Sequence, residues 1–398
     1  MIRKVRIGDL GEIITGNTPP RDKPEYYGSY TPFIKATDID ESSKHTYAPE
    51  EFYSEIGYQK YRKSLIPKGS TCVVTIGSIG KKMTMAHCDC FINQAMNAII
   101  PSANYDPEYV YYVVKHNVYR LKSLDSGTAS GRENVSKSAF SNLEINVIDD
   151  LEIQRKIGLA LSTYDAMIEN NRKQIKLLEE AAQRLYKEWF VDLRFPGHET
   201  TLIVDGVPEG WERMVLSEVT SVLKRGITPK YSNNGKYSVI NQKCIRNSIM
   251  DISESRRQEK EYATTLNLQD SDTVICSTGA GTLGRVGRVY GDYPNTTFDS
   301  HVTLIRAKEN PNYIYHVIKS QQEYLMGMGR GSTNQQELYR DVIEQLVVLC
   351  PSQDILLKAE RVLGAIHCKI KKIYLQNNLL VESRDRLLPK LMSGELEV

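Results

Sequence analysis

Features of secreted and membrane proteins are scarce in this sequence. It has seven cysteines, an odd number without a regular spacing, which indicates free thiols in a reducing compartment rather than a disulfide framework. No uncharged stretch approaches the ~20 apolar residues that a membrane-spanning helix needs. The first residues, Met1–Arg6, are not followed by the apolar run of a secretion signal. We therefore expect a cytoplasmic protein with no membrane partner.

An excess of charge of one sign is also lacking. The 398 residues include 51 Lys and Arg against 49 Asp and Glu, a formal net charge of +2. Composition alone therefore does not show the basic footprint of many nucleic-acid-binding proteins, and any basic surface must be local. The apolar fraction of 40% supports folded domains, and the length favours two or more of them.

Signatures of enzyme active sites are absent as well. There is no Gly-x-Ser-x-Gly elbow, no His-Glu-x-x-His, and no Asn-Pro-Pro-aromatic run of the kind adenine methyltransferases use. Gly279–Gly284 has the glycine spacing of a dinucleotide-binding loop, but Arg285–Gly291 reads as a strand where that loop requires a helix. His87–Cys90 lacks a second cluster at metal-ligand spacing. We predict no catalytic residues, no metal site and no cofactor bound by this chain.

What the sequence does contain is an internal repeat with a period of about two hundred residues, much longer than that of a solenoid. Four short segments of the first half recur in the same order in the second half. The pairs are Ile7–Pro19 with Leu216–Pro229, Val73–Gly80 with Val274–Gly284, Phe91–Ile99 with Phe298–Ile305, and Asp106–Tyr111 with Asn310–Tyr315. In the third pair, alternating apolar and polar positions predict a strand. The repeat predicts two related domains.

A long heptad pattern follows each globular half. Seam positions alternate steps of four and three from Ile157 to Trp189, and again from Ala359 to Leu387, with Leu391 as a possible last member. We expect Pro389 to end the regular helix near Leu388. The predicted parts are a first domain (1–150), a first helix (151–192), a linker (193–210), a second domain (211–352) and a second helix (353–398). The predicted fold class is α+β: two mixed α/β domains with twisted sheets, and two long helices.

Each heptad seam contains an asparagine, Asn171 in the first helix and Asn377 in the second. If the helices form an intramolecular antiparallel coiled coil with these residues side by side, Ile157 falls opposite Leu391 and the seams overlap almost completely. A buried asparagine that pairs only with another asparagine disfavours other registers. Alternatively, each is a tolerated polar residue without a register role. The overlap predicts a rod of about 45–50 Å that holds the domains apart.

A glycine turn followed by cations recurs in both halves. Lys81 and Lys82 follow Gly80, and Arg285 and Arg288 follow Gly284. Such turns let the backbone approach phosphates, with basic side chains beside it, although ordinary strand connections use glycine too.

A polar loop precedes each long helix, at residues 126–134 and 329–336. Arg, Asn and Gln side chains match the edges of G and A in the major groove. Solvated turns can have the same composition, but recurrence favours DNA contact. The loop candidates are Arg132, Asn134, Arg330, Ser332, Asn334 and Gln335; the others are Lys35, Thr37 and Gln94 in the first domain and Arg225, Lys230, Gln242, Lys243 and Arg246 in the second.

Three segments, Leu185–His198, Val207–Glu212 and Arg386–Gly394, resemble those of the specificity subunit of type I restriction-modification enzymes, and the resemblance covers the whole chain. It implies two target-recognition domains, each reading one half of a split asymmetric site in double-stranded DNA. It also implies two modification subunits, which bind S-adenosylmethionine and methylate adenine, and restriction subunits that translocate DNA with ATP and Mg²⁺. That chemistry belongs to the partner subunits.

Two other functional classes remain open. A coiled-coil scaffold would bind protein through its domains, and its binding to duplex DNA would lack the steep salt dependence of phosphate contacts. A DNA enzyme with an unrecognised site would turn over substrate without partner subunits. We expect no such turnover.

Overall fold

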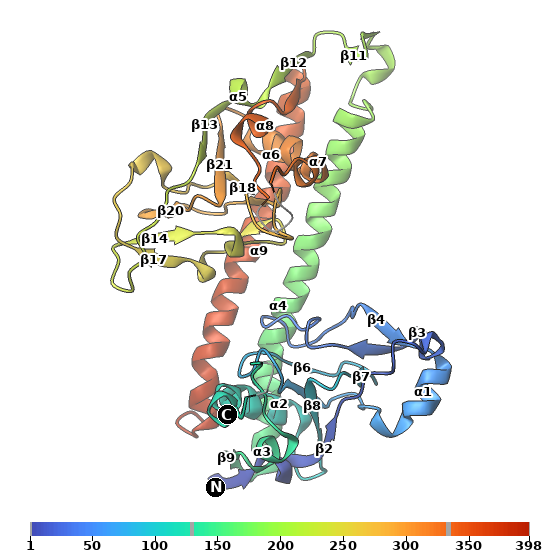
Figure 1. Ribbon diagram of the computed structural model, residues 1–398. Coiled ribbons are helices and arrows are strands. Elements are labelled where there is room, and N and C mark those ends of the chain that lie inside the picture. The colour runs from blue at the N-terminus through green and yellow to red at the C-terminus, as the bar shows by residue number, and fades with distance from the viewer. Residues whose placement is uncertain (1, 128–130, 332–335, 398) are drawn as a thin grey trace. The chain divides into compact units, whose positions relative to one another are not determined.

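The structure is a computed structural model that describes residues 2–127, 131–331 and 336–397 (Figure 1). The chain divides into two compact units. Unit 1 contains Met1–Lys173 and Gln376–Val398, and unit 2 contains Gln174–Leu375. The boundaries fall inside the two long helices, α4 (Leu151–Tyr186) and α9 (Gln353–Met392). Each unit therefore joins one globular domain to a segment of both helices.

Unit 1 is built on a four-stranded antiparallel sheet in the order β2-β8-β5-β6. Its strands are β2 (Gly11–Thr15), β5 (Thr71–Val74), β6 (Met83–Met85) and β8 (Met96–Pro101). The strand β5 is buried along its whole length because both of its faces are covered. Val73 packs toward helix α2 (Pro107–Asn117), whereas Cys72 and Val74 pack toward a second sheet.

The second sheet of unit 1 has the order β4-β3-β7, in which β3 and β7 run parallel. Its strands are β3 (Tyr27–Ile34), β4 (Glu51–Tyr53) and β7 (Phe91–Ile92), and the helix α1 (Glu55–Tyr61) packs beside β3 and β4. The helix α3 (Lys137–Asn142) packs on β2 of the first sheet. A short ribbon of β1 (Ile2–Arg6) and β9 (Glu144–Ile148) brings the start of the domain to the strand that leads into α4.

Unit 2 repeats this topology, which confirms the predicted duplication at the level of strand order. The order β13-β21-β18-β19 corresponds to β2-β8-β5-β6, and β17-β14-β20 corresponds to β4-β3-β7. Two more strands, β16 and β15, extend the large sheet. The strands are β12 (Glu212–Val215), β13 (Thr220–Arg225), β14 (Tyr237–Ile240), β15 (Ile245–Arg246), β16 (Ile249–Met250), β17 (Arg256–Gln258), β18 (Thr273–Cys276), β19 (Val286–Arg288), β20 (Thr296–Phe298), β21 (Val302–Ala307) and β22 (Val347–Cys350).

The remaining elements of unit 2 are helical or lie in the linker. The helices are α5 (Leu216–Val219), α6 (Pro311–Ser320), α7 (Gln322–Gly327) and α8 (Arg340–Glu344), and the linker forms a hairpin of β10 (Ile203–Val204) and β11 (Val207–Pro208). The ribbon β12-β22 takes the place that β1-β9 has in unit 1.

The prediction of one strand over Phe91–Ile99 was wrong. The structure has two strands there, β7 and β8, which belong to different sheets. They are joined by a tight turn in which the Met96 N–H donates to the Asn93 carbonyl (3.1 Å), and the Val302 N–H donates to the Asp299 carbonyl (3.0 Å) at the same place in unit 2. The alternating pattern continues across the turn, so the sequence hides it. Gln94 lies on this turn.

The helices α4 and α9 pack antiparallel in both units, as the heptad seams predicted. In unit 1, Ile157 and Leu161 share a buried cluster with Leu391, and Asn171 Nδ2 donates to Asn377 Oδ1 (2.9 Å). In unit 2, Ile175 packs in a cluster with residues 370–374. Residues with rising numbers along α4 contact residues with falling numbers along α9, as expected for antiparallel helices. None of the helices in the described ranges is both long and apolar enough to cross a bilayer.

The seam of unit 1 also contains a buried ion pair that the heptad pattern does not explain. Arg384 Nη1 donates to Asp165 Oδ1, and the hydroxyl of Tyr112 donates to Asp165 Oδ2 (2.5 Å). Burial raises the pKa of Asp165, but the charges of Lys115 and Arg384 outweigh it and hold that pKa below its ordinary value. A charged residue at a seam position is tolerated because its partners neutralise and bind it.

The expectation that Pro389 ends the second helix was also wrong. Helix α9 continues through Pro389 to Met392, and Leu391 is only 2% exposed. A proline removes one backbone donor and crowds one carbonyl. Here the ring is on the exposed side, whereas Leu388 and Leu391 are held in the core of unit 1. The packing of these two leucines offsets the missing hydrogen bond.

Candidate nucleic-acid interface

In unit 1, four loops meet at one end of the four-stranded sheet. We call them the first loop cluster, and they comprise residues 16–20, 76–82, 93–95 and 131–134. The Ala95 carbonyl lies at the centre and accepts the N–H groups of Thr75 (2.8 Å) and Ile76 (3.2 Å). The Val135 N–H donates to the Thr75 carbonyl (2.8 Å), and the Thr18 hydroxyl donates to Gln94 Oε1. Backbone bonds thus fix loops that are far apart in sequence.

Unit 2 has an equivalent second loop cluster, comprising residues 226–230, 277–284, 299–301 and 336–338. The Ser277 N–H donates to the His301 carbonyl (2.8 Å), as Thr75 does to Ala95 in unit 1. The Leu338 N–H donates to the Ser277 carbonyl (2.8 Å), as Val135 does to Thr75. The two clusters therefore share one pattern of backbone hydrogen bonds, although their side chains differ.

Gly16 and Gly226 show why the glycine of the first repeated segment is needed. Each enters its cluster by donating its N–H to the first residue of the neighbouring strand, Met96 or Val302 (3.0 Å in both cases). A Cβ atom on Gly16 would lie 2.1 Å from the Asn93 carbonyl oxygen, and one on Gly226 would lie 2.2 Å from the Asp299 carbonyl oxygen. Only glycine permits this backbone approach.

Most candidate contacts of the first domain lie on or beside the first loop cluster. The exposed ones are Thr37, Lys81, Gln94 and Arg132. Lys82 is half-buried, and its ammonium donates to the Ala36 carbonyl (3.3 Å), which brings the loop of Lys35 and Thr37 to the cluster. Lys35 pairs with Glu50 (2.7 Å) and Glu51 (3.0 Å), so its charge is largely compensated.

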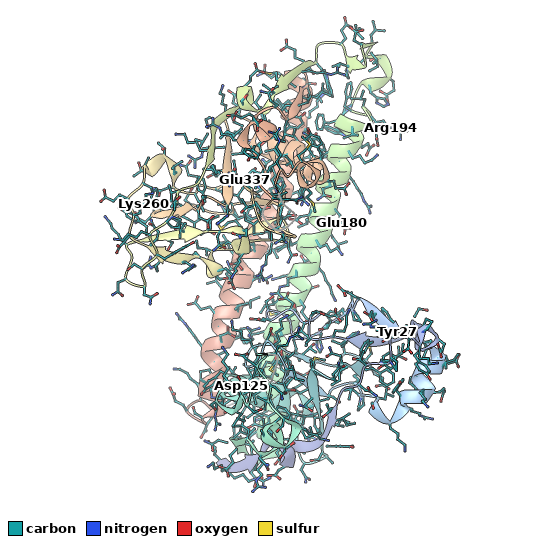
Figure 2. All side chains as sticks on the ribbon, viewed as in Figure 1. Tyr27, Asp125, Glu180, Arg194, Lys260 and Glu337 are labelled. Atoms are coloured by element: carbon teal, nitrogen blue, oxygen red, sulfur yellow. The ribbon has the colours of Figure 1, made fainter. Side chains whose placement is uncertain are left out.

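The loop that precedes α4 is shaped by Asp125, one of the residues labelled in Figure 2. Its carboxylate accepts the backbone N–H groups of Asn134 (2.7 Å) and Gly127 (2.9 Å). These two bonds hold the pKa of Asp125 below its ordinary value. Asn134 is half-buried, and its backbone also pairs with Ile76. Asp125 thus holds together Gly127 and Asn134, which flank the loop that carries Arg132.

The candidates of the second domain divide by exposure. Lys230, Lys243, Arg246 and Arg330 are exposed, and Arg225, Gln242 and Arg285 are half-buried. Lys230 pairs with Glu259, and Arg330 lies 3.7 Å from Asp341. Arg285 donates to the carbonyls of Ile245 (2.9 Å) and Gly281 (3.1 Å), so it holds the glycine loop against β15. The hydrogen bonds of Arg285 thus stabilise the fold.

Arg288 does not belong to this surface, which corrects the prediction from its position after the glycine turn. It is only 1% exposed, and its guanidinium donates to the Pro311 carbonyl (3.2 Å) and to Asn312 Oδ1 (2.6 Å). The strand β19 turns this side chain inward toward α6, whereas the turn pattern suggested a surface. Three other candidates, Ser332, Asn334 and Gln335, lie outside the described residues.

The structure adds three residues that sequence reasoning missed, namely Thr278, His301 and Glu337. The Thr278 hydroxyl and His301 Nδ1 are 2.6 Å apart, and Glu337 Oε1 accepts from Arg225 Nη1. Figure 2 labels Glu337. The repeat offered a signal, because aligning the two halves places His301 on the turn of Gln94 and Glu337 beside the loop before α9. Burial raises the pKa of the neighbouring Asp299, whose carboxylate accepts the His301 N–H.

The two clusters carry side chains and backbone turns of the kinds that contact nucleic acids in other proteins. Exposed Lys and Arg neutralise phosphates, and Gln, Asn, Thr and Arg bind base edges. Strand β19 follows Gly284 almost directly, so the glycine loop does not open the helix that binds a dinucleotide. Among the described residues, no three His, Cys, Asp or Glu side chains are grouped to hold a metal ion.

Comparisons with known proteins identify this architecture. The profile of the type I restriction modification DNA specificity domain matches the chain twice, at residues 2–180 and 208–355. The chain belongs to the family of type I restriction-modification DNA specificity proteins. This confirms the resemblance inferred from Leu185–His198, Val207–Glu212 and Arg386–Gly394, and it places the chain among proteins of DNA sequence recognition.

Two curated relatives are similar to the chain. The type I restriction enzyme MjaIX specificity subunit of Methanocaldococcus jannaschii is 27% identical over 419 residues, which cover 99% of this chain and 93% of the relative. The type I restriction enzyme HindI specificity subunit of Haemophilus influenzae is 33% identical over 173 residues, 42% of this chain and 37% of the relative.

The crystal structure of the S subunit of a type I restriction-modification system from M. genitalium aligns with a TM-score of 0.59 at 17% identity, over 98% of this chain and 96% of that one. The shared fold is that of two domains and two long helices.

Proposed function

We propose that this chain is the non-catalytic reader of a type I restriction-modification complex and that each domain recognises one half of a bipartite asymmetric DNA site. The observation that carries the proposal is the pair of loop clusters. Their backbone hydrogen bonds agree, as in Thr75 to Ala95 and Ser277 to His301, whereas the side chains that they present differ. Two loop clusters with the same backbone structure but different side chains suit two half-sites of different sequence.

The long helices have two roles in this proposal. They set the spacing of the half-sites, and they dock two modification subunits. Exposed apolar side chains on the helices support docking, since Leu159 and Leu177 of α4 and Leu357 and Leu379 of α9 are each at least 59% exposed. Such side chains on a charged helix surface are typical of protein interfaces.

The chemistry of the complex lies on the partner subunits. S-adenosylmethionine would be bound by the modification subunits, and ATP and Mg²⁺ would be used by the restriction subunits. This chain would supply the sequence preference alone. Its contribution to DNA affinity would fall steeply with salt, because phosphate contacts release counterions.

Methylome sequencing tests the proposal. Cells that carry this chain with its modification subunits should gain methylated adenine in one motif made of two specified parts and an unspecified spacer. Cells that carry the modification subunits alone are the control and should show no such motif. If the complete set of subunits assembles and no new methylation arises, the proposal is wrong.

A further inference from the structure

Arg225, the last residue of β13, is held in one orientation. Its Nε donates to the Ser300 carbonyl, and its Nη1 donates to Glu337 Oε1. The side chain is 29% exposed. Among the residues that the structure describes, no hydrogen-bond partner is found for Nη2, and Nη1 has one N–H left over. Nη1 and Nη2 therefore each keep an N–H that no described residue accepts.

The partners of Arg225 are themselves fixed by backbone bonds. Arg330 and Glu337 exchange a pair of N–H···O bonds (3.0 and 2.9 Å), and the next residue, Leu338, donates to the Ser277 carbonyl (2.8 Å). The turn that supplies the Ser300 carbonyl is closed by the Val302 N–H on the Asp299 carbonyl (3.0 Å). The backbone of both loops that supply the acceptors is therefore fixed.

Because Arg225 forms an ion pair with Glu337, it is better suited to contact a base edge than a phosphate. A phosphate contact draws on full positive charge, which the exposed Arg246 offers, whereas the charge of Arg225 is largely compensated by Glu337 and the nearby Asp299. A base edge is uncharged and demands planar geometry. Guanine presents O6 and N7 as two acceptors side by side, and an arginine with two parallel donors matches them.

We propose that Arg225 reads a guanine in the half-site of the second domain and that Glu337 is the residue that positions it. The inference rests on the proposed function and assigns one base contact within it. The first domain has no such pair, since the corresponding positions before Gly16 and beside Ile76 are Thr15 and Asn134. A guanine contact made by this pair should therefore be confined to the second half-site.

The test uses the complex of this chain with its modification subunits and a pool of DNA duplexes. The first half-site is fixed, and the second is randomised. Arg225→Lys keeps the charge but loses the planar fork. It should lower the preference for guanine at one position by about 10-fold or more and leave the first half-site and the salt dependence of binding unchanged. Arg213→Lys, at an exposed arginine of β12 outside the second loop cluster, is the matched control and should keep the selected sequence.

Glu337 is tested by two variants with the same change of charge. Glu337→Gln retains an oxygen that accepts from Arg225, and Glu337→Ala does not. Both should shift the salt dependence equally, but only Glu337→Ala should weaken the guanine preference, so the amide rescues the contact. A merely electrostatic role would make the two variants alike.

The outcomes separate this inference from the proposed function. If the wild-type complex selects no second half-site, the proposed function fails. If it selects one and Arg225→Lys changes no position, or the two Glu337 variants behave alike, the inference is overturned. Loss of both half-sites in Arg225→Lys would overturn it as well, because that result would assign the arginine to the stability of the chain.

Discussion

Asn171 and Asn377 show at the scale of single residues what a sequence pattern can predict. Each is 8% exposed, and they are joined by a hydrogen bond of 2.9 Å. The pairing followed from heptad arithmetic, because aligning the antiparallel seams with Ile157 opposite Leu391 also places Asn171 opposite Asn377. Their role in fixing the register is a prediction.

A double-mutant cycle tests that role. Asn171→Leu leaves the amide of Asn377 buried without a partner and should lower the free energy of unfolding of unit 1 by about 1–3 kcal/mol. Asn171→Leu with Asn377→Leu should recover most of this loss, because neither side chain then needs a partner. Hydrogen exchange along α4 measures both. Asn170→Leu, on the exposed side of the same turn, is the control. A double variant as unstable as the single one would argue against the pairing.

The membership of the candidate interface could not be fully derived from the sequence. Arg288 follows a glycine turn just as Lys81 does, yet its side chain points into the core toward Asn312. Glu337 was missed because its partner Arg225 is 112 residues away and meets it only when three loops close together. A composition pattern reports which side chains a loop contains. It does not report which face a short strand presents, and that decides whether a cation reaches solvent.

At the scale of elements, the long helices were predictable because a seam of more than four heptads is a strong periodic signal. The domains were less so. The alternation over Phe91–Ile99 continues through the turn between β7 and β8, so it gave one strand in place of two. The polar contacts between the helices and the domains were also hidden. In unit 2, His316 of α6 and His367 of α9 lie with their Nε2 atoms 3.0 Å apart.

This histidine pair predicts a pH-dependent stability of unit 2. Both rings are at least 96% buried, and the hydroxyl of Tyr290 lies 2.9 Å from His367 Nδ1. Burial, and then the charge of Arg288, lower the pKa of both, that of His316 to about 3. The unfolded chain takes up protons first, near pH 6.5. Stability is therefore full above that pH and is lost as the pH falls toward 3, by about 1.4 kcal/mol per pH unit for each histidine.

Hydrogen exchange at pH 7.5 and 5.5, corrected for intrinsic rates, measures this effect. The amides of α6 should lose more protection at the lower pH than those of α2, which has Tyr112 where α6 has His316 and contains only the half-buried His116, whose pKa burial also lowers. His367→Gln removes one of the two protons and should reduce the loss. Equal changes in α2 and α6 would mean that another group controls the acid response.

At the scale of the whole molecule, the division into two units was not foreseen. The sequence suggested domains, helices and a linker as successive parts, whereas each compact unit combines one domain with segments of both helices. The reason is packing. The core of unit 1 includes Leu388 and Leu391 from the far end of the chain together with Ile157 and Leu161. Local patterns identify the helices, but only long-range contacts assign their segments.

Because α4 and α9 each cross the boundary between the units, their length should determine the spacer of the bipartite site. One heptad inserted into both helices, after Lys173 and after Leu375, keeps both seams in phase and adds about 10.5 Å of helix. At 3.4 Å per base pair, the unspecified spacer should grow by about three base pairs. Both half-sites should stay the same, since no residue of either loop cluster changes.

Methylome sequencing of the insertion variant gives the spacer directly. Seven residues inserted into the linker, within 198–206, are the control and should leave the spacer as it is. Altered half-sites, or a spacer that ignores the added heptads, would show that the helices do not act as the ruler.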